Sequence, residues 1–275
     1  MIDNTKYLLV RDRLPALYLQ HTRIFVENGN IKAEQDKETF SIQPNILCAI
    51  MLGEGTSITH SAVKLLSQYK TQIQWVSNNS LLTYACMPCL QLNADNVIRQ
   101  ARLSSDASLR SKVAHRMFQM RFNDNTQYPS LEGLRGAEGI KVKKEYNKIA
   151  SQFGVKWEGR SYVVSDPSKS DLPNQLLTLA NHYLYSACLS AILRLGYSPA
   201  LGFIHNKSIL SFALDIADIY KTEYAIIPAF KNTTMICHDH TKLLHTELSE
   251  LYYSGGLLKI VEDGIESLIG ESCSY

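Results

Sequence analysis

The chain has 275 residues, of which 45% are hydrophobic and 20% charged, and its formal net charge is +2. So mild a charge does not by itself indicate a nucleic-acid partner, and six scattered cysteines are unlike the dense disulfide framework of small secreted domains. No run approaches the roughly 18 to 20 apolar residues that span a bilayer, and the chain does not begin like a secretory signal. We therefore expect a cytoplasmic protein with no membrane contact.

The first third of the chain carries short β-prone runs separated by turn residues. Asn28-Gly29 lies between two of these runs and is a dipeptide typical of tight hairpin turns. One helix is expected from about His60 to Tyr69, because its apolar residues fall on one face. The predicted strands are residues 7–10, 16–20, 24–27, 46–52, 71–76 and 80–85.

The hydrophobic pattern of the sequence changes at about Asn96, after which apolar residues recur at helical spacing. Just before this change Pro88 interrupts regular structure. We therefore predict an α+β protein with an N-terminal β domain, residues 1–88, and a mainly α-helical C-terminal domain, residues 89–275. Breaks between helices are expected at 123–130, 157–173 and 196–199, where turn residues gather.

Basic residues are concentrated at the start of the helical part. Residues 97–148 contain eleven Lys or Arg against five Asp or Glu. If residues 138–150 are helical, Lys141, Lys144 and Lys148 share one face. Such a face is either a solvated helix surface or a site for phosphate groups, and charge alone leaves both interpretations open.

Two aspartates, Asp215 and Asp218, lie three residues apart in the apolar helical stretch 211–221. This spacing puts them on one face of a helix. Carboxylates beside a hydrophobic face are costly to bury unless a positive charge pairs with them. A divalent cation would supply that charge, and so would Arg194 or Lys221.

His205 precedes this pair by ten residues, and Glu138 is an acidic residue within the basic stretch. One imidazole with carboxylate oxygens suits Mg²⁺ or Mn²⁺ and suits structural zinc poorly. Each residue also has a simpler interpretation. His205 would be a hydrogen-bonded core histidine, and Glu138 would cap or neutralise the basic helix.

Four ordered strings decide between these interpretations. LRGAEG (134–139), GVKWEGRSY (154–162), GYSPALGFIH (196–205) and SFALDIADIYK (211–221) resemble, in order and separation, the CRISPR-associated protein one family. The likeness extends to CAIMLGEGTSITHSAV (48–63) and VAHRMFQMRF (113–122), so it covers most of the chain to about residue 231. It is strongest to the type I-E branch.

This resemblance implies an N-terminal β-sandwich, a helical catalytic domain and a homodimer. In the family, two such dimers flank a dimer of CRISPR-associated protein two, and the assembly inserts a short DNA duplex into the repeat array. The resemblance also implies that Glu138, His205 and Asp218 hold a catalytic Mg²⁺ or Mn²⁺, with Asp215 as an accessory acidic residue. A 3′-hydroxyl of the incoming DNA then attacks a repeat phosphodiester, without a protein nucleophile.

Further residues are candidates for contacts to double-stranded DNA. Tyr162 and Tyr185 match tyrosines near the active site of this branch, and ordinary core tyrosines are the alternative. His21 stands where related proteins carry an aromatic wedge, and Ser57 stands where they carry an arginine. The basic candidates for phosphate contacts, close in sequence to the predicted ligands, are Arg135, Lys141, Lys143, Arg160 and Lys221.

Other functions remain to be weighed against spacer integration. A repair nuclease acting on branched DNA and a non-catalytic DNA-binding scaffold are the alternatives. Cys86 and Cys89 form a C-x-x-C pair that Cys237 and His240 would complete as a zinc site, but nothing in the sequence brings the two segments together. We expect no zinc there. The working ion, the preferred protospacer motif and any host factors are not predictable from the sequence.

Overall fold

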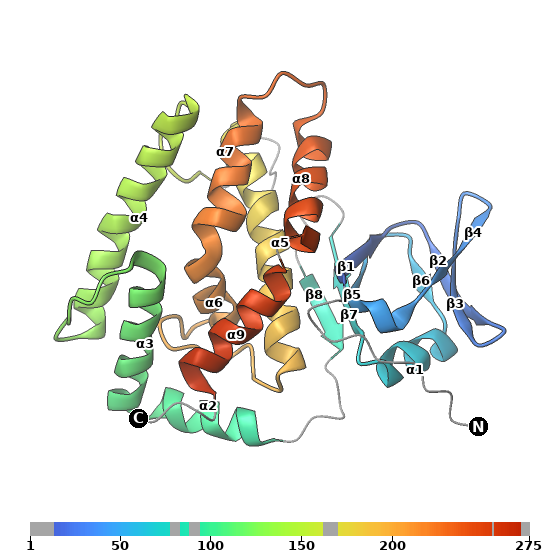
Figure 1. The fold of residues 1–275 in the computed structure, drawn as a ribbon, viewed down its shortest axis with the longest axis horizontal. Helices are drawn as coiled ribbons and strands as arrows, with labels where there is room; N and C mark the ends of the chain where they lie inside the picture. The colour runs from blue at the N-terminus through green and yellow to red at the C-terminus, as the bar shows by residue number, and fades with distance from the viewer. Residues whose placement is uncertain (1–13, 78–82, 88–93, 162–169, 255, 271–275) are drawn as a thin grey trace.

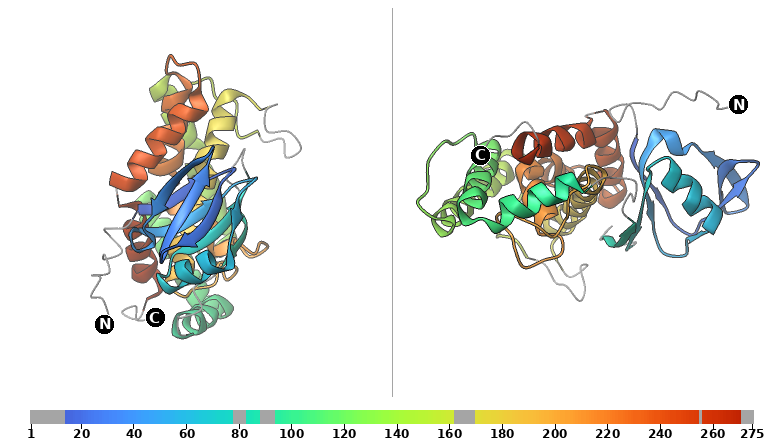
Figure 2. Two further views of the ribbon diagram at one scale, coloured as in Figure 1. Left: turned by 90° about the vertical axis from the view of Figure 1, so that its right-hand side faces the viewer. Right: turned by 90° about the horizontal axis from the view of Figure 1, so that it is seen from below.

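The computed structural model describes residues 14–77, 83–87, 94–161, 170–254 and 256–270. The strands lie at one end of an elongated molecule and the long helices at the other (Figure 1 and Figure 2). This order of elements, strands first and helices afterwards, confirms the predicted α+β class. The predicted strand at residues 7–10, Cys89 and the predicted site residue Tyr162 lie outside the described residues.

The described strands form two four-stranded sheets with the orders β1-β5-β7-β8 and β4-β3-β2-β6. In the first sheet β1, β5 and β7 are parallel and β8 is antiparallel to β7. The bounds are β1 (Leu14–Leu19), β2 (Arg23–Glu27), β3 (Asn30–Gln35), β4 (Glu38–Ile42), β5 (Leu47–Leu52), β6 (Ser57–Ile58), β7 (Gln72–Val76) and β8 (Thr83–Met87).

One apolar core is shared by both sheets and by α1 (His60–Gln68). Ile24 and Ile31 of the second sheet and Ile50 and Ile73 of the first are fully buried in it. Alternating strand positions supply these side chains, because successive residues of a strand point to opposite faces. Two sheets that share one core agree with the expected sandwich-like domain.

Two tight hairpins shape the second sheet. Asn28 and Gly29 both have positive φ, 51° and 77°, between β2 and β3, which confirms the predicted hairpin. Asp36 and Lys37 form a similar turn between β3 and β4, with φ of 51° and 70°. Lysine rarely adopts positive φ, and neither residue of this turn is glycine. The sequence therefore gave no hairpin signal here, and this second turn was not predicted.

The helical part is built around α5, which packs against α6, α7, α8 and α9. Side chains cap several N-termini, as Ser130 does for α4 and Asp171 for α5. The bounds are α2 (Asp95–Ser105), α3 (Ala107–Phe122), α4 (Leu131–Phe153), α5 (Leu172–Arg194), α6 (Ser211–Lys221), α7 (Ile227–Thr233), α8 (His240–Ser254) and α9 (Leu257–Ile269).

Among the described residues, α5 is the one helix long and apolar enough to span a membrane by length and composition. Most of its apolar window is buried inside the molecule, as expected for the central helix of a packed bundle. The absence of membrane contact stays a prediction.

Between α6 and α7 the chain passes through one π-helical turn, Thr222–Ile226. The amide of Ile227 donates to the carbonyl of Thr222, five residues earlier. Pro228, at the start of α7, has no amide hydrogen to donate and limits the regular α-helical pattern here. The turn comes directly after Lys221, so it fixes where the end of α6 points.

A polar seam joins the two halves of the molecule. The Gln74 side-chain amide donates to the Ser190 hydroxyl at 2.7 Å, and the hydroxyl groups of Thr83 and Ser186 lie 3.0 Å apart. Met51 and Val76 of the first sheet nevertheless belong to the helical core. Because packing crosses the seam, the predicted division at residue 88 stays a prediction.

Candidate active site

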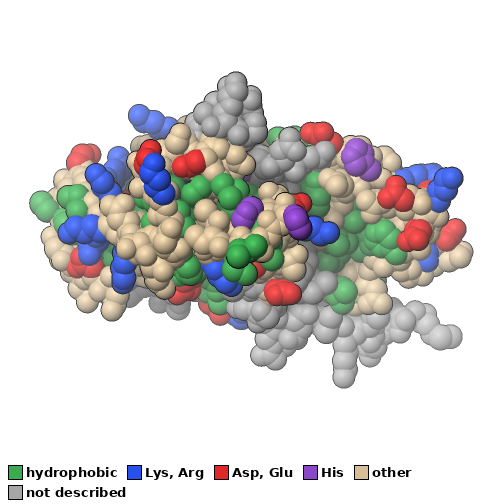
Figure 3. All heavy atoms as spheres, turned by 90° about the horizontal axis from the view of Figure 1, so that it is seen from above, with side chains coloured by type: hydrophobic (Ala, Val, Ile, Leu, Met, Phe, Trp, Pro, Cys, Tyr) green, Lys and Arg blue, Asp and Glu red, His purple; other side chains and the backbone are tan. Residues whose placement is uncertain are grey.

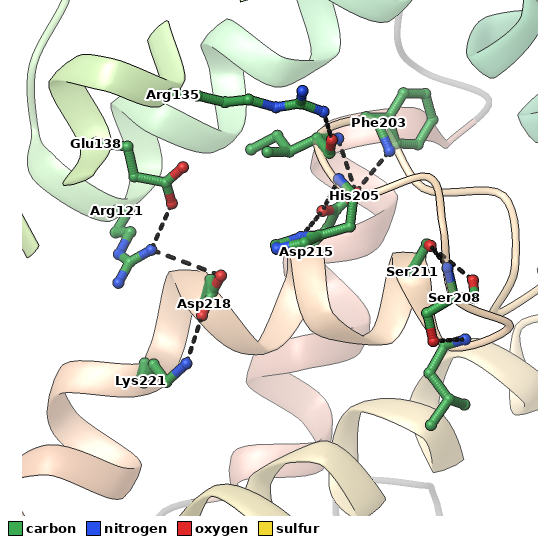
Figure 4. A network of polar contacts seen from close by, with 12 residues as sticks. Arg121, Arg135, Glu138, Phe203, His205, Ser208, Ser211, Asp215, Asp218 and Lys221 are labelled. Atoms are coloured by element: carbon green, nitrogen blue, oxygen red, sulfur yellow. Dashed lines mark hydrogen bonds and ion pairs between the residues drawn. The ribbon is translucent and has the colours of Figure 1, made fainter. Parts of the chain in front are cut away.

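The predicted ligands come from separate elements and lie in one region, where Glu138 and Asp218 face Arg121 and His205 is bonded to Asp215 (Figure 4). Glu138 lies in α4, Asp218 lies in α6, and His205 lies in the loop that precedes α6. Their side chains are 16%, 20% and 43% exposed, so each is reachable from solvent although partly buried. Sequence reasoning therefore selected three residues that the fold brings to one region.

Asp215 is the organising residue of the loop before α6. Its carboxylate accepts hydrogen bonds from the amides of Phe203, Ile204 and His205, at 2.6, 3.0 and 2.9 Å. The side chain is fully buried, and three successive amides that donate to one carboxylate compensate its buried charge. Gly202 fits this arrangement because a Cβ there would overlap the His205 carbonyl oxygen.

The orientation of His205 follows from the same carboxylate. Asp215 Oδ1 lies 2.7 Å from Nδ1 of the His205 ring, which leaves Nε2 directed away from Asp215. The hydrogen bond to Asp215 raises the pKa of His205, although partial burial of the ring opposes the shift. Asp215 was predicted as an accessory acidic residue among the catalytic ones, and the geometry gives it a positioning role that acts through His205.

The Arg121 guanidinium lies between the two other carboxylates (Figure 4). Its Nη1 is 2.7 Å from Glu138 Oε1 and 3.8 Å from Asp218 Oδ2. On the opposite side Lys221 Nζ is 2.8 Å from Asp218 Oδ1. Both carboxylates are thus neutralised by basic side chains, one of them by the Asp218–Lys221 pairing that the sequence left open.

Burial and these cations shift the two acids in opposite directions. Burial raises the pKa of Glu138 above its ordinary value, although the Arg121 charge opposes it. Burial would also raise the pKa of Asp218, but Lys221 and Arg121 outweigh that effect and hold it below its usual value. Asp218 therefore stays ionised at neutral pH, and Glu138 is the easier of the two to protonate.

The donor set has the right chemistry for a hard divalent ion, but the side chains are not gathered around one point. In the parts of the chain that the structure describes, no three His, Cys, Asp or Glu side chains form a ready metal site. The guanidinium of Arg121 lies between Glu138 and Asp218, and its Nε is buried without a hydrogen-bond partner in the described structure. The predicted metal site stays a prediction.

Several residues predicted to contact DNA are engaged within the protein. Arg135 donates to the carbonyl of Ile204, next to His205. Arg160 donates to the backbone and side chain of Asn174 and to Thr178, which ties the loop after α4 to the start of α5. The structure gives both arginines a role in holding loops.

The remaining candidates differ in their access to solvent. Lys141 pairs with Asp124 at 3.0 Å, and its side chain is 36% exposed. Lys143 is exposed on the surface of α4. Tyr185 is partly buried, and Lys221 donates to its hydroxyl at 3.4 Å. His21 is exposed, in a turn after β1 with a φ of 49°.

Arg121 is the site residue that sequence reasoning missed. It lies in the motif VAHRMFQMRF, which was used only as a sign of family likeness. A permanent charge next to buried Met117 and Phe118 in α3 is the signal that would have found it, since such a charge requires a partner.

A groove lies between α3 and the loop that follows it. This groove of about 620 Å³ is lined by polar and basic side chains, among them Lys112, His115 and Arg116, and none of its described lining residues is acidic. His115 links its two walls, because Nδ1 lies 2.7 Å from the Ser111 carbonyl and the Tyr128 amide donates to Nε2. Elsewhere basic side chains are mixed with acidic ones, as the coloured part of Figure 3 shows for one face.

Comparison with solved structures first identifies the fold, which is that of Cas1 structures. The chain superposes on the TtCas1–DNA complex with a TM-score of 0.74 and 33% identity, covering 95% of this chain and 98% of that one. A CAS1 protein from Thermotoga maritima, 16% identical with a TM-score of 0.74, and a casposase bound to integration product, 15% identical with a TM-score of 0.71, share the fold.

Sequence comparison then gives the family. The model of "CRISPR associated protein Cas1" matches residues 16–128 and 118–242. The chain is 35% identical to CRISPR-associated endonuclease Cas1 2 of Chlorobaculum tepidum, over 96% of this chain and 91% of that protein. It is 37% identical to CRISPR-associated endonuclease Cas1 of Escherichia coli K12, over 81% and 73%. The chain belongs to the Cas1 family.

Family membership confirms the main resemblance found in the sequence. The relatives come from many species, among them Thermus thermophilus and Methanospirillum hungatei, so they do not select one branch of the family. The type I-E assignment therefore stays a prediction.

Proposed function

We propose that this Cas1 protein is the integrase of CRISPR spacer acquisition and that Mg²⁺ or Mn²⁺ takes part in its reaction. The observation that supports this most is that Glu138, His205 and Asp218 come from three separate segments and lie close enough to influence one another electrostatically. In a family whose curated members are named endonucleases, acids and an imidazole so arranged favour phosphodiester chemistry.

Glu138, His205 and Asp218 would hold the ion, since two carboxylates and one imidazole nitrogen suit Mg²⁺ or Mn²⁺. A bound ion would polarise the phosphodiester and stabilise charge on the attacking and leaving oxygens. Asp215 holds the His205 ring in one orientation, and Lys221 keeps Asp218 ionised. The attacking group is a 3′-hydroxyl of the incoming DNA, so no side chain needs to act as a nucleophile.

Double-stranded DNA is the proposed substrate, both as incoming spacer and as repeat. A solved structure similar to this chain is a Cas1–DNA complex. Lys141, Lys143 and the basic groove beside α3 are surfaces for its phosphates. Tyr162, Tyr185 and His21 remain proposed contacts to the DNA, and Arg135, Arg160 and Lys221 contribute through the loops and ligands that they hold.

The proposed assembly is the one that the sequence resemblance implies. A homodimer of this chain, paired with a second homodimer across a dimer of CRISPR-associated protein two, forms a heterohexamer that acts in the cytoplasm. Assignment to the type I-E branch is part of the same proposal.

The test is a strand-joining assay with a short DNA duplex and a plasmid that carries the repeat. Asp218→Ala is expected to abolish joining while DNA affinity changes by less than about threefold, because a ligand serves chemistry more than binding. Asp263→Ala, which removes an exposed acid from α9, is the matched control and should join normally. Undiminished joining by Asp218→Ala would contradict the proposal.

Two alternatives make different predictions in the same assay. A nuclease that acts on branched DNA, consistent with relatives that are named endonucleases, would cut branched substrates in an Asp218-dependent way without joining ends. A non-catalytic scaffold, favoured by the neutralised carboxylates, would bind DNA and do neither.

A further inference from the structure

Glu138 and Asp218 share a cation that belongs to the protein. Arg121 is 5% exposed, makes a 2.7 Å ion pair with Glu138 and lies 3.8 Å from Asp218. Arginine side chains carry a permanent positive charge in proteins. The two carboxylates are thus held near each other by a permanent charge that comes from α3 and not from α4 or α6.

The local charges make this pairing sensitive to any added ion. With His205 neutral, as a metal ligand must be, Glu138, Asp215 and Asp218 contribute three negative charges, and Arg121 and Lys221 contribute two positive ones. A divalent ion bound beside both cations would leave the region positive, and buried charges of one sign repel strongly. The ion and the Arg121 guanidinium therefore compete for the same carboxylate oxygens.

Arg121 also makes fewer hydrogen bonds than a purely structural arginine, although its guanidinium lies 5.0 Å from the centre of the Phe122 ring. Its Nε is buried without a hydrogen-bond partner in the described structure, and its link to Asp218 is longer than a hydrogen bond. Arg160, in contrast, makes three hydrogen bonds of 2.7 to 3.0 Å to Asn174 and Thr178. An unsatisfied buried N–H lowers the cost of moving the Arg121 side chain away.

We propose that Arg121 is the resident counter-ion of the Glu138 and Asp218 carboxylates, that a divalent ion displaces it, and that this exchange sets the metal affinity of the site. The inference rests on the proposed function, because it assumes that these acids hold the ion. Arg121 is then a positioning residue. Without metal it holds Glu138 and Asp218 together, and it weakens metal binding because it competes with the ion for their oxygens.

Binding of Mn²⁺, measured by electron paramagnetic resonance or calorimetry without DNA, tests the exchange. Arg121→Met removes the charge and keeps much of the apolar stem, so Mn²⁺ is expected to bind roughly three- to tenfold more tightly. The matched control is Arg194→Met, which removes the cation of another buried pair, Arg194–Glu262, at 3.1 Å. That control should bind Mn²⁺ as the unaltered protein does.

Glu138→Gln separates failure of this inference from failure of the proposed function. If Glu138→Gln weakens Mn²⁺ binding but Arg121→Met binds Mn²⁺ equally or less tightly than the unaltered protein, the inference is overturned and the metal site stands. If Mn²⁺ binding is absent, or is unaffected by Glu138→Gln, both are overturned.

A second measurement covers the case in which Arg121→Met loses its fold in chelator. Glu138 would then lack its counter-ion and would destabilise the site, and saturating Mn²⁺ is expected to restore the melting temperature toward that of the unaltered protein. The double variant Arg121→Met with Glu138→Gln should show no such recovery. An Arg121→Met protein that stays unfolded in Mn²⁺ overturns the inference.

Discussion

Asp215 and Asp218 lie three residues apart on α6, yet their surroundings differ in kind. Asp215 is fully buried and receives its hydrogen bonds from three backbone amides and one imidazole. Asp218 is partly exposed and is balanced by the side chains of Lys221 and Arg121. Backbone amides cannot leave without unfolding the loop, whereas charged side chains can exchange for another cation. One aspartate therefore holds the loop in place, and the other is balanced by side-chain cations that another cation could replace.

The largest expected effect on stability comes from Asp215→Ala. This change leaves three buried amides without an acceptor, so the free energy of unfolding should fall by about 3 to 5 kcal/mol. Denaturant unfolding followed by circular dichroism measures it, with the exposed Asp263→Ala as control, which should change stability by less than about 0.5 kcal/mol. A loss below 1 kcal/mol would show that the amides find other partners.

Gly202→Ala should disturb the same loop, because the new side chain would collide with the loop backbone. The new Cβ would lie 2.9 Å from Asp215 Oδ2 and would overlap the His205 carbonyl oxygen. We expect a loss of about 1 to 3 kcal/mol and slower strand joining, since His205 would shift. Gly136→Ala, in an open part of α4, should instead be neutral or stabilise the protein by up to about 1 kcal/mol. Equal stabilities of the two variants would contradict this account of the loop.

Asp218→Asn should have a much smaller effect on stability than Asp215→Ala. It removes one negative charge but keeps a side-chain oxygen that can still accept a hydrogen bond from Lys221, whose Nζ lies 2.8 Å from Asp218 Oδ1. The free energy of unfolding is expected to change by less than about 1 kcal/mol in metal-free buffer, although joining activity is lost. Thermal unfolding in chelator measures this, and a loss comparable to that of Asp215→Ala would erase the distinction between the two aspartates.

The smallest effect concerns a histidine outside both regions. Burial lowers the pKa of His245, and the Tyr183 hydroxyl lies 2.6 Å from its Nδ1. Because the folded state favours neutral His245, its contribution to stability is complete above the ordinary pKa and is lost as pH falls from about 6.5 through the lowered value. His245→Gln should flatten this part of the stability curve by less than about 1 kcal/mol. If His245→Gln left the pH dependence of stability unchanged, His245 would not be the group responsible for it.

Much of the fold was predictable because its signals are local. Asn28-Gly29 specifies a hairpin by itself, and the apolar period after Asn96 marks helices that must bury one face. The turn at Asp36-Lys37 has positive φ without glycine, so local propensity gave no sign of it. There the pairing of β3 with β4 imposes the conformation.

The closeness of the predicted ligands in the fold was predictable from the sequence, but the contacts that each of them makes were not. Glu138, His205 and Asp218 were found as acids and an imidazole within recognisable strings, and Lys221 as a partner of Asp218 follows from helical spacing. The contacts of Asp215 with loop amides depend on a turn that no periodicity encodes. The Arg121 pairing joins α3 to α4 and α6 and is fixed only by tertiary packing.

The most direct test of the shared ion site is the anomalous scattering of Mn²⁺ in crystals of the intact protein. The account predicts one strong peak within about 2.0 to 2.3 Å of oxygens of Glu138 and Asp218 and of Nε2 of His205, with Arg121 withdrawn from Glu138. Crystals at saturating Mn²⁺ with no peak there, or with the ion held by other residues, would contradict it.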